Sequence, residues 1–394
     1  MHLDFDFRPG EGLPYSALGR LRDAGPVVWS ENLGGWLVTS WAAVREVLGD
    51  VGRFTSAGTP VAEVFGGQGM LVDDTPMHHV LRAVWAKRVT PVAMQARMAE
   101  LDDNARRVLA PPAERMKAGE VVDFIPVFRD FVMEFIALSF GVSRAHLDIF
   151  ENWSKMSADT PALGLEQGSE AQERHNRARA DVVALVAGEM EDRRQRLDRG
   201  EDPADLIAPM VAAVGEKGIT RQMAADNLFN FILGAMDTTE KWIGNIVLHL
   251  AADPAMRARV AANYSLIAAL ADEVMRFDTV AQTIQRRVRE PGTRLAGRDL
   301  KGGDTIYLML GAANRDETEY TGADSFVLDR PPSANLGFGF GFHHCLGINI
   351  ARAEVVAFIG VLLDTLGPLR IAGCDHGDSW ALWGPRRLEL ALAD

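Results

Sequence analysis

Apolar residues recur at helical spacing along most of the chain. The clearest case is the segment 220–252, where large aliphatic and aromatic residues form a stripe with a period near 3.6 residues. Thr220 is suited to cap the start of this helix, and Pro254 ends the pattern. A helix of that length is about 45–50 Å long and crosses a whole domain. Further helical patterns cover residues 76–90, 97–116, 124–140, 170–198, 263–277 and 347–366.

Strand patterns are few and short. They cover 27–29, 36–38, 305–310 and a C-terminal hairpin-like run around Leu382 and 388–392. The segments 110–120, with two adjacent prolines, and 192–205, which is dense in charge, have the composition of loops but are too short for domain linkers. We therefore expect a mainly α protein with small β-sheets at its edges, folded as a single domain over residues 1–394.

Composition narrows the class of protein. The chain has 394 residues, of which 47% are hydrophobic and 24% charged, and this balance excludes a disordered or fibrous chain. A net charge of -13 argues against a general nucleic-acid binder. The N-terminus lacks the pattern of a signal peptide, and no apolar run approaches the roughly 18 residues that span a bilayer. We expect a cytoplasmic protein with no membrane segment.

The most unusual stretch, 336–347, alternates glycine with phenylalanine and then places a cysteine directly before a helix. Glycines let the backbone turn sharply and approach a ligand closely. Cys345 is expected at a helix N-terminus, where the helix dipole and free N–H groups stabilise a thiolate. A thiolate in an apolar, glycine-lined loop is suited to be an axial ligand of iron.

Other interpretations of this loop are weaker. A phosphate-binding loop needs a Lys-Ser or Lys-Thr after the glycines, and none follows here. A zinc site needs further ligands at suitable spacing, and the other cysteine, Cys374, is distant and interpreted as structural. A lone buried cysteine is more often an inert small hydrophobe.

The fixed positions of the loop resemble the haem-binding signature of the cytochrome P450 family of haem-thiolate monooxygenases; they are Phe338, Gly339, Gly341, His343, Cys345 and Gly347. The resemblance implies the cytochrome P450 fold, in which a long central distal helix and the cysteine loop sandwich the haem. It also implies haem b, with the Cys345 thiolate as axial ligand, contacted by Phe338, Gly339, His343 and Gly347.

Small residues, an acid and two hydroxyls interrupt the stripe of the long helix at 234–239. On the residues alone, this is a helix kink with a solvated aspartate, or a place where small side chains leave room beside the helix. The run resembles the distal-helix motif of the family. That resemblance gives Asp237 and Thr238 the role of delivering protons to iron-bound O2 and places Gly234 beside the haem.

Two further sets of residues agree with the family. Glu273 and Arg276, three apart, form on their own no more than a solvated ion pair; with Arg330 they resemble the family's buried network that holds the cysteine loop. Basic residues in three distant segments resemble those that meet the haem propionates: His78, Arg82, Arg286 (or its neighbour Arg287) and His343. The alternative for the first two is an exposed basic helix face.

The resemblance implies insertion of one oxygen atom of O2 into a substrate, by hydroxylation or O-dealkylation. Because the chain carries no flavin or nicotinamide motif, we expect electrons from partner proteins. The resemblance implies that these partners are a ferredoxin and its ferredoxin reductase. The ferredoxin is expected to dock near Arg82, Lys87, Arg88 and Arg352.

The expected pocket wall is mostly apolar, which favours a small hydrophobic substrate, aromatic or terpenoid-like. It includes Asn230, Leu233, Gly234, Val280 and Ala281, with parts of 59–72, 156–168 and 380–383. Asn230 either bonds a substrate carbonyl or hydroxyl or packs against a neighbouring helix. A peroxide-driven peroxygenase and a non-catalytic haem carrier or sensor remain as alternative functions.

Overall fold

The computed structural model describes residues 15–59, 68–159, 169–331, 334–377 and 381–393, with side chains omitted for 154–159. Helices dominate these segments. They are α1 (Tyr15–Ala24), α2 (Trp41–Gly49), α4 (Pro76–Trp85), α5 (Pro91–Gln95), α6 (Met98–Lys117), α7 (Ile125–Phe140), α8 (Leu147–Asp159), α9 (Glu170–Asp198), α10 (Ala208–Ala212), α11 (Arg221–Ala252), α12 (Pro254–Ala262), α13 (Leu266–Phe277), α14 (Leu310–Ala313) and α15 (Ile348–Thr365).

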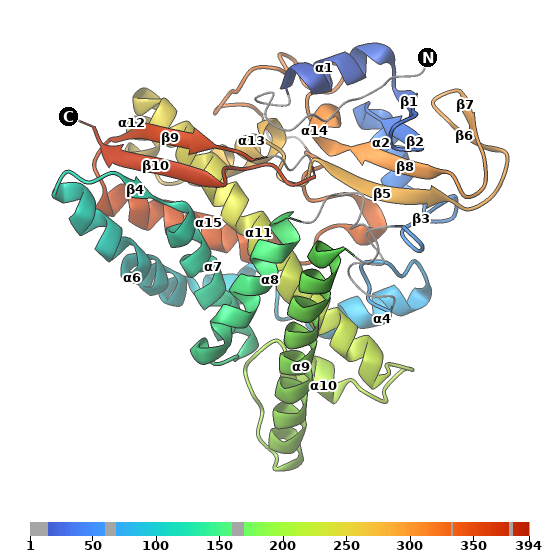
Figure 1. Ribbon diagram of the computed structural model, residues 1–394, viewed down its shortest axis with the longest axis horizontal. Helices are drawn as coiled ribbons and strands as arrows, with labels where there is room; N and C mark the ends of the chain where they lie inside the picture. Colours follow the sequence, from blue (N-terminus) through green and yellow to red (C-terminus); the bar gives the residue numbers. More distant parts are fainter. Residues whose placement is uncertain (1–14, 60–67, 160–168, 332–333, 378–380, 394) are drawn as a thin grey trace.

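Three small sheets accompany the helices (Figure 1). The largest has the order β1-β2-β8-β5-β3, with strands Val27–Ser30, Gly35–Val38, Thr305–Met309, Thr283–Val288 and Phe54–Thr55. The second has the order β4-β10-β9, with strands Val122–Asp123, Arg387–Leu392 and Leu369–Asp375. The third is the hairpin of β6 (Thr293–Leu295) and β7 (Arg298–Leu300).

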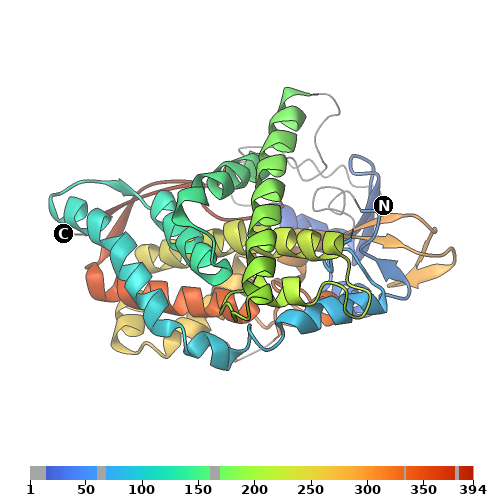
Figure 2. The same cartoon turned by 90° about the horizontal axis from the view of Figure 1, so that it is seen from below.

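Helix α11 is the axis of the helical part. Its N-cap Thr220 accepts a hydrogen bond from the Met223 N–H, and the helix ends before Pro254, as the sequence predicted. Its middle is buried on nearly every face, so it runs through the core instead of along the surface. It lies beside α15, and Figure 2 shows the two helices running lengthwise through the molecule.

The main hydrophobic core joins α11 and α15 to α6, α7 and α13. A second core lies between α2 and the five-stranded sheet. The loop that carries Cys345 lies where these two cores meet, because Phe338 packs on the first and Phe340 on the second. The fold thereby places this loop between the helical part and the sheet.

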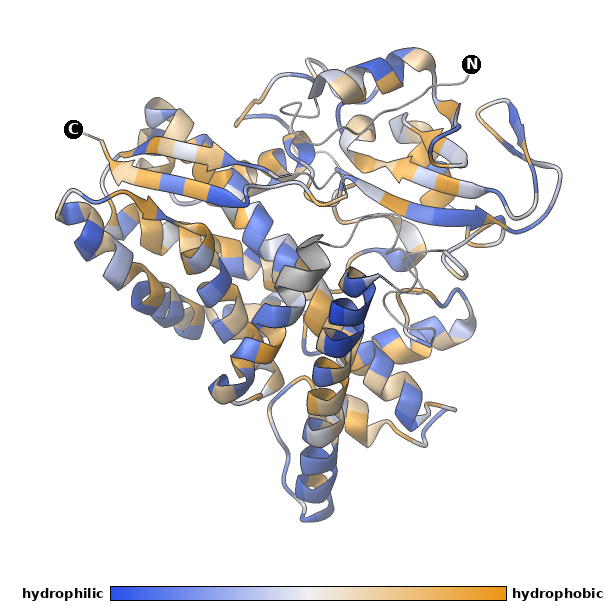
Figure 3. Ribbon diagram, viewed as in Figure 1, coloured by the Kyte–Doolittle hydropathy of each residue, from blue (hydrophilic) through white to orange (hydrophobic). Residues whose placement is uncertain are grey.

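The helical patterns predicted over 97–116 and 170–198 are confirmed, whereas the loops predicted over 110–120 and 192–205 and the hairpin at Leu382 were wrong in part. Helix α6 continues to Lys117 with Pro111 and Pro112 inside it, and α9 continues to Asp198. The charged run stays helical because Arg194 pairs with Glu191 and Asp198 at helical spacing; Figure 3 shows that end of α9 as hydrophilic. The C-terminal hairpin is β9 with β10, whereas Leu382 makes only an isolated bridge to Ala281.

No helix in the described segments has both the length and the apolar character that crossing a bilayer requires.

Candidate functional site

Two glycines give the cysteine loop its shape. Gly339 and Gly341 have φ angles of +71° and +69°, a region that residues with a side chain rarely adopt. A Cβ on Gly341 would also lie 2.8 Å from the carbonyl oxygen of Leu48. The Cys345 N–H donates to the Phe338 carbonyl over 2.9 Å, which closes the loop. The glycines therefore set the path of the backbone that delivers the sulfur.

The pKa of the Cys345 thiol is raised, because the effect of burial exceeds that of the groups that favour a thiolate. These groups are the backbone N–H groups of Gly347 and Ile348 and the charge of Arg82. Both N–H groups belong to the start of α15, whose dipole favours negative charge. Among the described residues, no group of three or more acidic, histidine or cysteine side chains forms an alternative metal cluster.

Helix α11 passes close to this loop. A Cβ on Gly347 would lie 3.8 Å from Phe231, near the start of the helix's central part, and 4.0 Å from the Cys345 sulfur. Farther along, the ring of Trp242 lies 5.2 Å from that of Phe338. The segment that contains Gly234 and Thr238 lies between these two contacts along α11.

Two features distinguish that segment: the glycine at 234 leaves space beside the helix, and the Thr238 hydroxyl bonds back to the helix backbone. A Cβ on Gly234 would meet no heavy atom within 4 Å, so the helix surface has room beside it. The Thr238 hydroxyl donates to the Gly234 carbonyl over 2.7 Å, as the sequence suggested. Asp237 is half-buried one residue earlier.

Several basic groups near the loop are buried without an acid. Arg286 is 8% exposed, and its one hydrogen-bond acceptor among the described residues is the carbonyl of its neighbour Gln285. Burial lowers its pKa to about 10, an effect that the nearby Asp74 only partly offsets. His78 is 1% exposed with an unpartnered Nδ1, and burial lowers its pKa to about 4. Burial also lowers the pKa of Arg82.

These groups fit the two carboxylates of a haem. Arg82 and Arg286 are cations that need anionic partners when buried, and the neutral His78 ring can donate a hydrogen bond. The two neighbouring arginines differ in their surroundings: Arg286 is buried, while Arg287 is half-buried and donates to the carbonyls of Gly58 and Gly303. The described residues thus supply a thiol and nearby basic groups, because Arg82 acts on Cys345 and Asp74 acts on Arg286.

His343 has a partner that the sequence did not reveal. Its Nε2 lies 2.7 Å from Oδ1 of Asp74. The other oxygen of Asp74, Oδ2, accepts from the Thr55 hydroxyl, from the Ser56 N–H and from Arg289. Burial raises the pKa of Asp74, but the hydrogen bonds from His343 and Thr55 outweigh it and the pKa is lowered. In the sequence, Asp74 lies two residues before Pro76, and this position indicated only that a helix begins there.

The network of Glu273, Arg276 and Arg330 is present in space. Glu273 accepts two hydrogen bonds of 2.8 Å from Arg276 and two of 3.2 Å from Arg330. Arg276 also donates to the Asn314 carbonyl, and the Asn314 side chain accepts from the Leu336 N–H at the start of the cysteine loop. The network is therefore connected to the loop by hydrogen bonds.

The expected pocket residues are only partly brought together. Asn230 is 7% exposed, and neither amide atom has a hydrogen-bond partner among the described residues. It lies against Gly69, where a Cβ would be 2.1 Å from its Nδ2. Leu233 and Val280 belong to the main core, whereas Ala281 packs on the sheet core. The expected wall segments 60–67, 160–168 and 380 lie outside the described residues.

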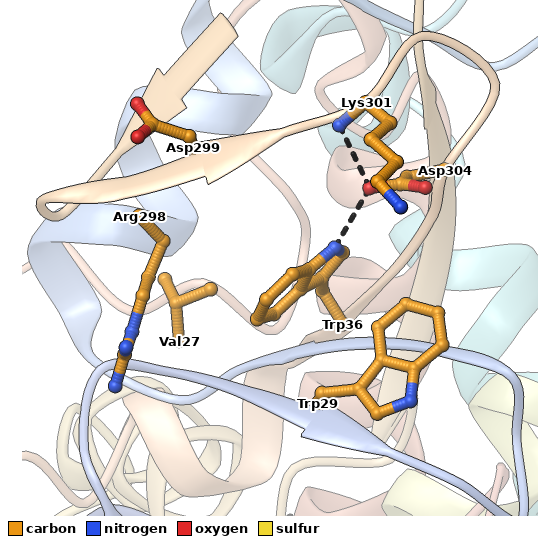
Figure 4. Close-up of a pocket in the computed structure, with 7 residues that line it drawn as sticks. All are labelled: Val27, Trp29, Trp36, Arg298, Asp299, Lys301 and Asp304. Carbon is orange, nitrogen blue, oxygen red and sulfur yellow. Dashed lines mark hydrogen bonds between the residues drawn. The ribbon is translucent and has the colours of Figure 1, made fainter. Parts of the chain in front are cut away.

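A surface pocket of about 330 Å³ lies apart from all these residues, between the first sheet and the β6–β7 hairpin (Figure 4). Trp29 and Trp36 line it, and the Trp36 Nε1 donates to Asp304 over 2.8 Å. None of the candidate site residues contributes to this pocket.

Comparison with known proteins agrees with this geometry. The family model described as Cytochrome P450 matches residues 28–366. The mycinamicin IV hydroxylase/epoxidase of Micromonospora griseorubida is 30% identical over 371 residues, covering 90% of this chain and 89% of that protein. The biotin biosynthesis cytochrome P450 of Bacillus subtilis (strain 168) is 26% identical over 370 residues, covering 91% and 90%.

Solved structures share the fold. P450BioI, in complex with an acyl carrier protein ligated to hexadec-9Z-enoic acid, has a TM-score of 0.86 at 23% identity, covering 96% of this chain and 98% of its own. CYP109E1 from Bacillus megaterium, in complex with testosterone, has a TM-score of 0.86 at 24% identity, covering 97% and 98%. A matching family model over most of the chain and a relative of 30% identity lead to one conclusion: the chain belongs to the cytochrome P450 family, whose enzymes are haem-thiolate monooxygenases.

Proposed function

We propose that Cys345 is the axial ligand of a haem b and that His78, Arg82 and Arg286 receive its propionates. This proposal rests mainly on the surroundings of the Cys345 sulfur. The sulfur accepts hydrogen bonds from two backbone N–H groups at the start of α15, and it lies near the middle of α11. Phe338, Gly339 and Gly347 shape the loop around the sulfur. His343 contributes through Asp74, because its Nε2 is already engaged there.

A bound haem supplies activation of O2 and transfer of one oxygen atom to the substrate. The chain supplies the protons that release the second oxygen atom as water. We assign their delivery to Asp237 and Thr238. The Thr238 hydroxyl bonds back to Gly234 and so lies against the helix surface, where it can exchange that acceptor for another.

The substrate that fits best is a small hydrophobic molecule, aromatic or terpenoid-like, with one hydrogen-bonding group. The apolar residues Leu233, Val280 and Ala281 contribute burial without directional bonds. The Asn230 amide, enclosed and unpartnered, offers both a donor and an acceptor. Leaving both unsatisfied costs free energy, which a substrate carbonyl or hydroxyl would recover. The reaction is a hydroxylation or an O-dealkylation.

The electrons come from a ferredoxin and its reductase. The candidate docking residues lie just after α4 and in α15, the helix that begins beyond Cys345. Lys87 is exposed there, whereas Arg88 and Arg352 are engaged with acidic partners of this chain. Lys87→Glu should slow reduction by an acidic ferredoxin, most strongly at low salt, while Lys301→Glu, an exposed lysine after β7, should not.

The experiment for the substrate site uses the haem-loaded protein and two ligands of one shape, the ketone camphor and the hydrocarbon bornane. Binding is followed by the spin-state change in the absorption spectrum. A hydrogen bond to Asn230 predicts about three- to tenfold preference for the ketone. Asn230→Leu should abolish that preference. An equal preference in both proteins would remove Asn230 from the substrate site.

Turnover distinguishes the functions. Product formed from O2 with ferredoxin and reductase supports the monooxygenase. Product formed with hydrogen peroxide but not with that system would favour a peroxygenase, and tight gas binding without any turnover would favour a haem carrier or sensor.

A further inference from the structure

Two tryptophans meet in the surface pocket of about 330 Å³ that the proposed reaction does not use (Figure 4). Trp29 of β1 and Trp36 of β2 lie directly opposite each other in the antiparallel pair of strands. Their ring centroids are 5.3 Å apart, and the ring planes make an angle of 75°. Both side chains are half-buried, so they present flat apolar surface to the pocket.

The tryptophan pair is held in a fixed arrangement. The Trp36 Nε1 donates to Oδ2 of Asp304 over 2.8 Å, and the same oxygen accepts from the Lys301 N–H over 2.9 Å. Trp29 is packed with its ring nearly perpendicular to that of Trp36, an arrangement that aromatic pairs favour. Because these side chains are already ordered, a ligand that stacks on them loses little conformational entropy in doing so.

The charges of the pocket lining do not balance. Arg298 and Lys301 are cationic, and Asp299 and Asp304 are anionic. Asp299 is paired with Arg294 over 3.0 Å, and Arg294 is not part of the lining. Two cations therefore face a single acid that has no cation of its own. The local excess is positive although the whole chain has a net charge of -13.

Three hydrogen-bond donors of the lining are open to a ligand. The Arg298 guanidinium, the Lys301 ammonium and the Trp29 Nε1 have no acceptor among the described residues, and Figure 4 shows them around the tryptophan pair. Each of these groups can only donate. A guanidinium binds a carboxylate through two parallel N–H···O bonds, which are charge-assisted. Open donors beside an aromatic wall therefore favour an anion with a flat apolar body.

We propose that this pocket binds a flat aromatic carboxylate, with its ring on the tryptophan pair and its carboxylate on Arg298. The volume of the pocket lies near the lower end of the range for small-molecule sites, about 300–1,000 Å³, which suits a molecule of one or two rings. The site does not depend on the proposed monooxygenase function, because none of the candidate haem-site residues lines it. Lys301 adds positive potential beside the ligand.

The test is isothermal titration calorimetry of the ferric holoprotein with two probes, 2-naphthoate and its neutral analogue of the same shape, 2-naphthamide. The parent should bind the carboxylate about three- to tenfold more tightly than the amide. This preference should decrease at high salt, because the cations are exposed. The haem absorption is recorded in parallel, so that any probe that enters the haem pocket is counted separately.

Two substitutions locate the binding. Arg298→Gln should remove the preference for the carboxylate. Arg370→Gln is the matched control, because Arg370 is also an exposed arginine of a strand, β9, and lies far from the β6–β7 hairpin in Figure 1. It should keep the preference. Trp29→Leu should weaken both probes by about three- to tenfold, because both stack on the ring.

Equal binding of the two probes to the parent, or no saturable binding of naphthoate, would overturn the proposal. The same holds if Arg298→Gln keeps the preference that the parent shows. Because Arg298 is exposed, this variant should fold even if Trp29→Leu does not. Failure of the proposed function has a different signature: the parent would lack a thiolate-type spectrum, while its binding of naphthoate would still respond to Arg298→Gln.

Discussion

Removal of the charge of Glu273 tests whether the buried network stabilises the cysteine loop. Glu273→Gln keeps the size of the side chain but leaves Arg276, whose side chain is 2% exposed, and Arg330, at 11%, without their shared counter-ion. The Val327 N–H, which donates to the same carboxylate over 2.9 Å, meets a weaker acceptor or an amide nitrogen. Breaking a buried ion pair from one side costs about 3–5 kcal/mol.

The expected shift follows from the size of the protein. Unfolding entropy is about 2.1 cal/mol/K per residue, so 394 residues give about 0.8 kcal/mol/K. The substitution should therefore lower the Tm of the ferric protein by about 4–6 °C. Because the network is bonded through Asn314 to the cysteine loop, bound haem per chain should fall as well.

The assay is thermal unfolding followed by circular dichroism, with haem content from the absorption spectrum. Glu46→Gln is the matched control: Glu46 pairs with Arg53 over 2.8 Å at the surface, and exposed pairs contribute about 0–1 kcal/mol. It should lower the Tm by about 1 °C or less. If Glu273→Gln behaves like this control and keeps its haem, the network does not hold the loop.

Three further predictions concern stability and haem binding. Gly341→Ala should cost about 1–3 kcal/mol and release haem, because it combines a positive φ with a clash at Leu48, whereas Gly297→Ala, with φ +80° and open space, should cost only about 1 kcal/mol in urea unfolding. Hydrogen bonds lower the pKa of Asp278 against the effect of burial, so the ionised carboxylate stabilises the fold above the unfolded pKa of about 3.9, and this stabilisation is lost as the pH falls through the lower folded pKa. Asp278→Asn should therefore lower the free energy of unfolding at pH 7, and the two proteins should become equally stable in strong acid. A difference in stability that does not change with pH would contradict this. Cys374→Ala should leave the haem spectrum unchanged, because Cys374 is an exposed residue of β9, and loss of haem would refute its structural role.

The hydrophobic pattern predicted the helices well because most of them bury one continuous stripe. It failed where local composition and tertiary packing disagree. Pro111 and Pro112 have the composition of a loop, yet α6 continues through them, since their neighbours pack into the main core and Pro112 is itself buried. A single sequence contains no measure of that packing, which overrides the cost of the missing N–H groups.

The missed strand β5 shows a second limit. Its sequence is mostly polar, so period-two alternation did not stand out, and the register of Arg286 and Arg287 stayed open. Once the segment is a strand, neighbouring side chains point to opposite faces, and only Arg286 is turned inward.

The candidate site was predictable where a short motif carries the chemistry, as at Cys345 and Thr238. Residues that matter through distant contacts were not. Asp74 meets His343 across 269 positions of sequence. Charged residues of this kind have no periodic signal, and their role appears only when the fold brings them together.

The most direct test of the account is the absorption spectrum of the purified protein, reduced and exposed to carbon monoxide. The account predicts a strongly red-shifted band typical of a thiolate-ligated haem, lost in Cys345→Ser and kept in Cys374→Ala. A histidine-type band, or a protein that binds no haem, would contradict the assignment of Cys345 and with it the proposed function.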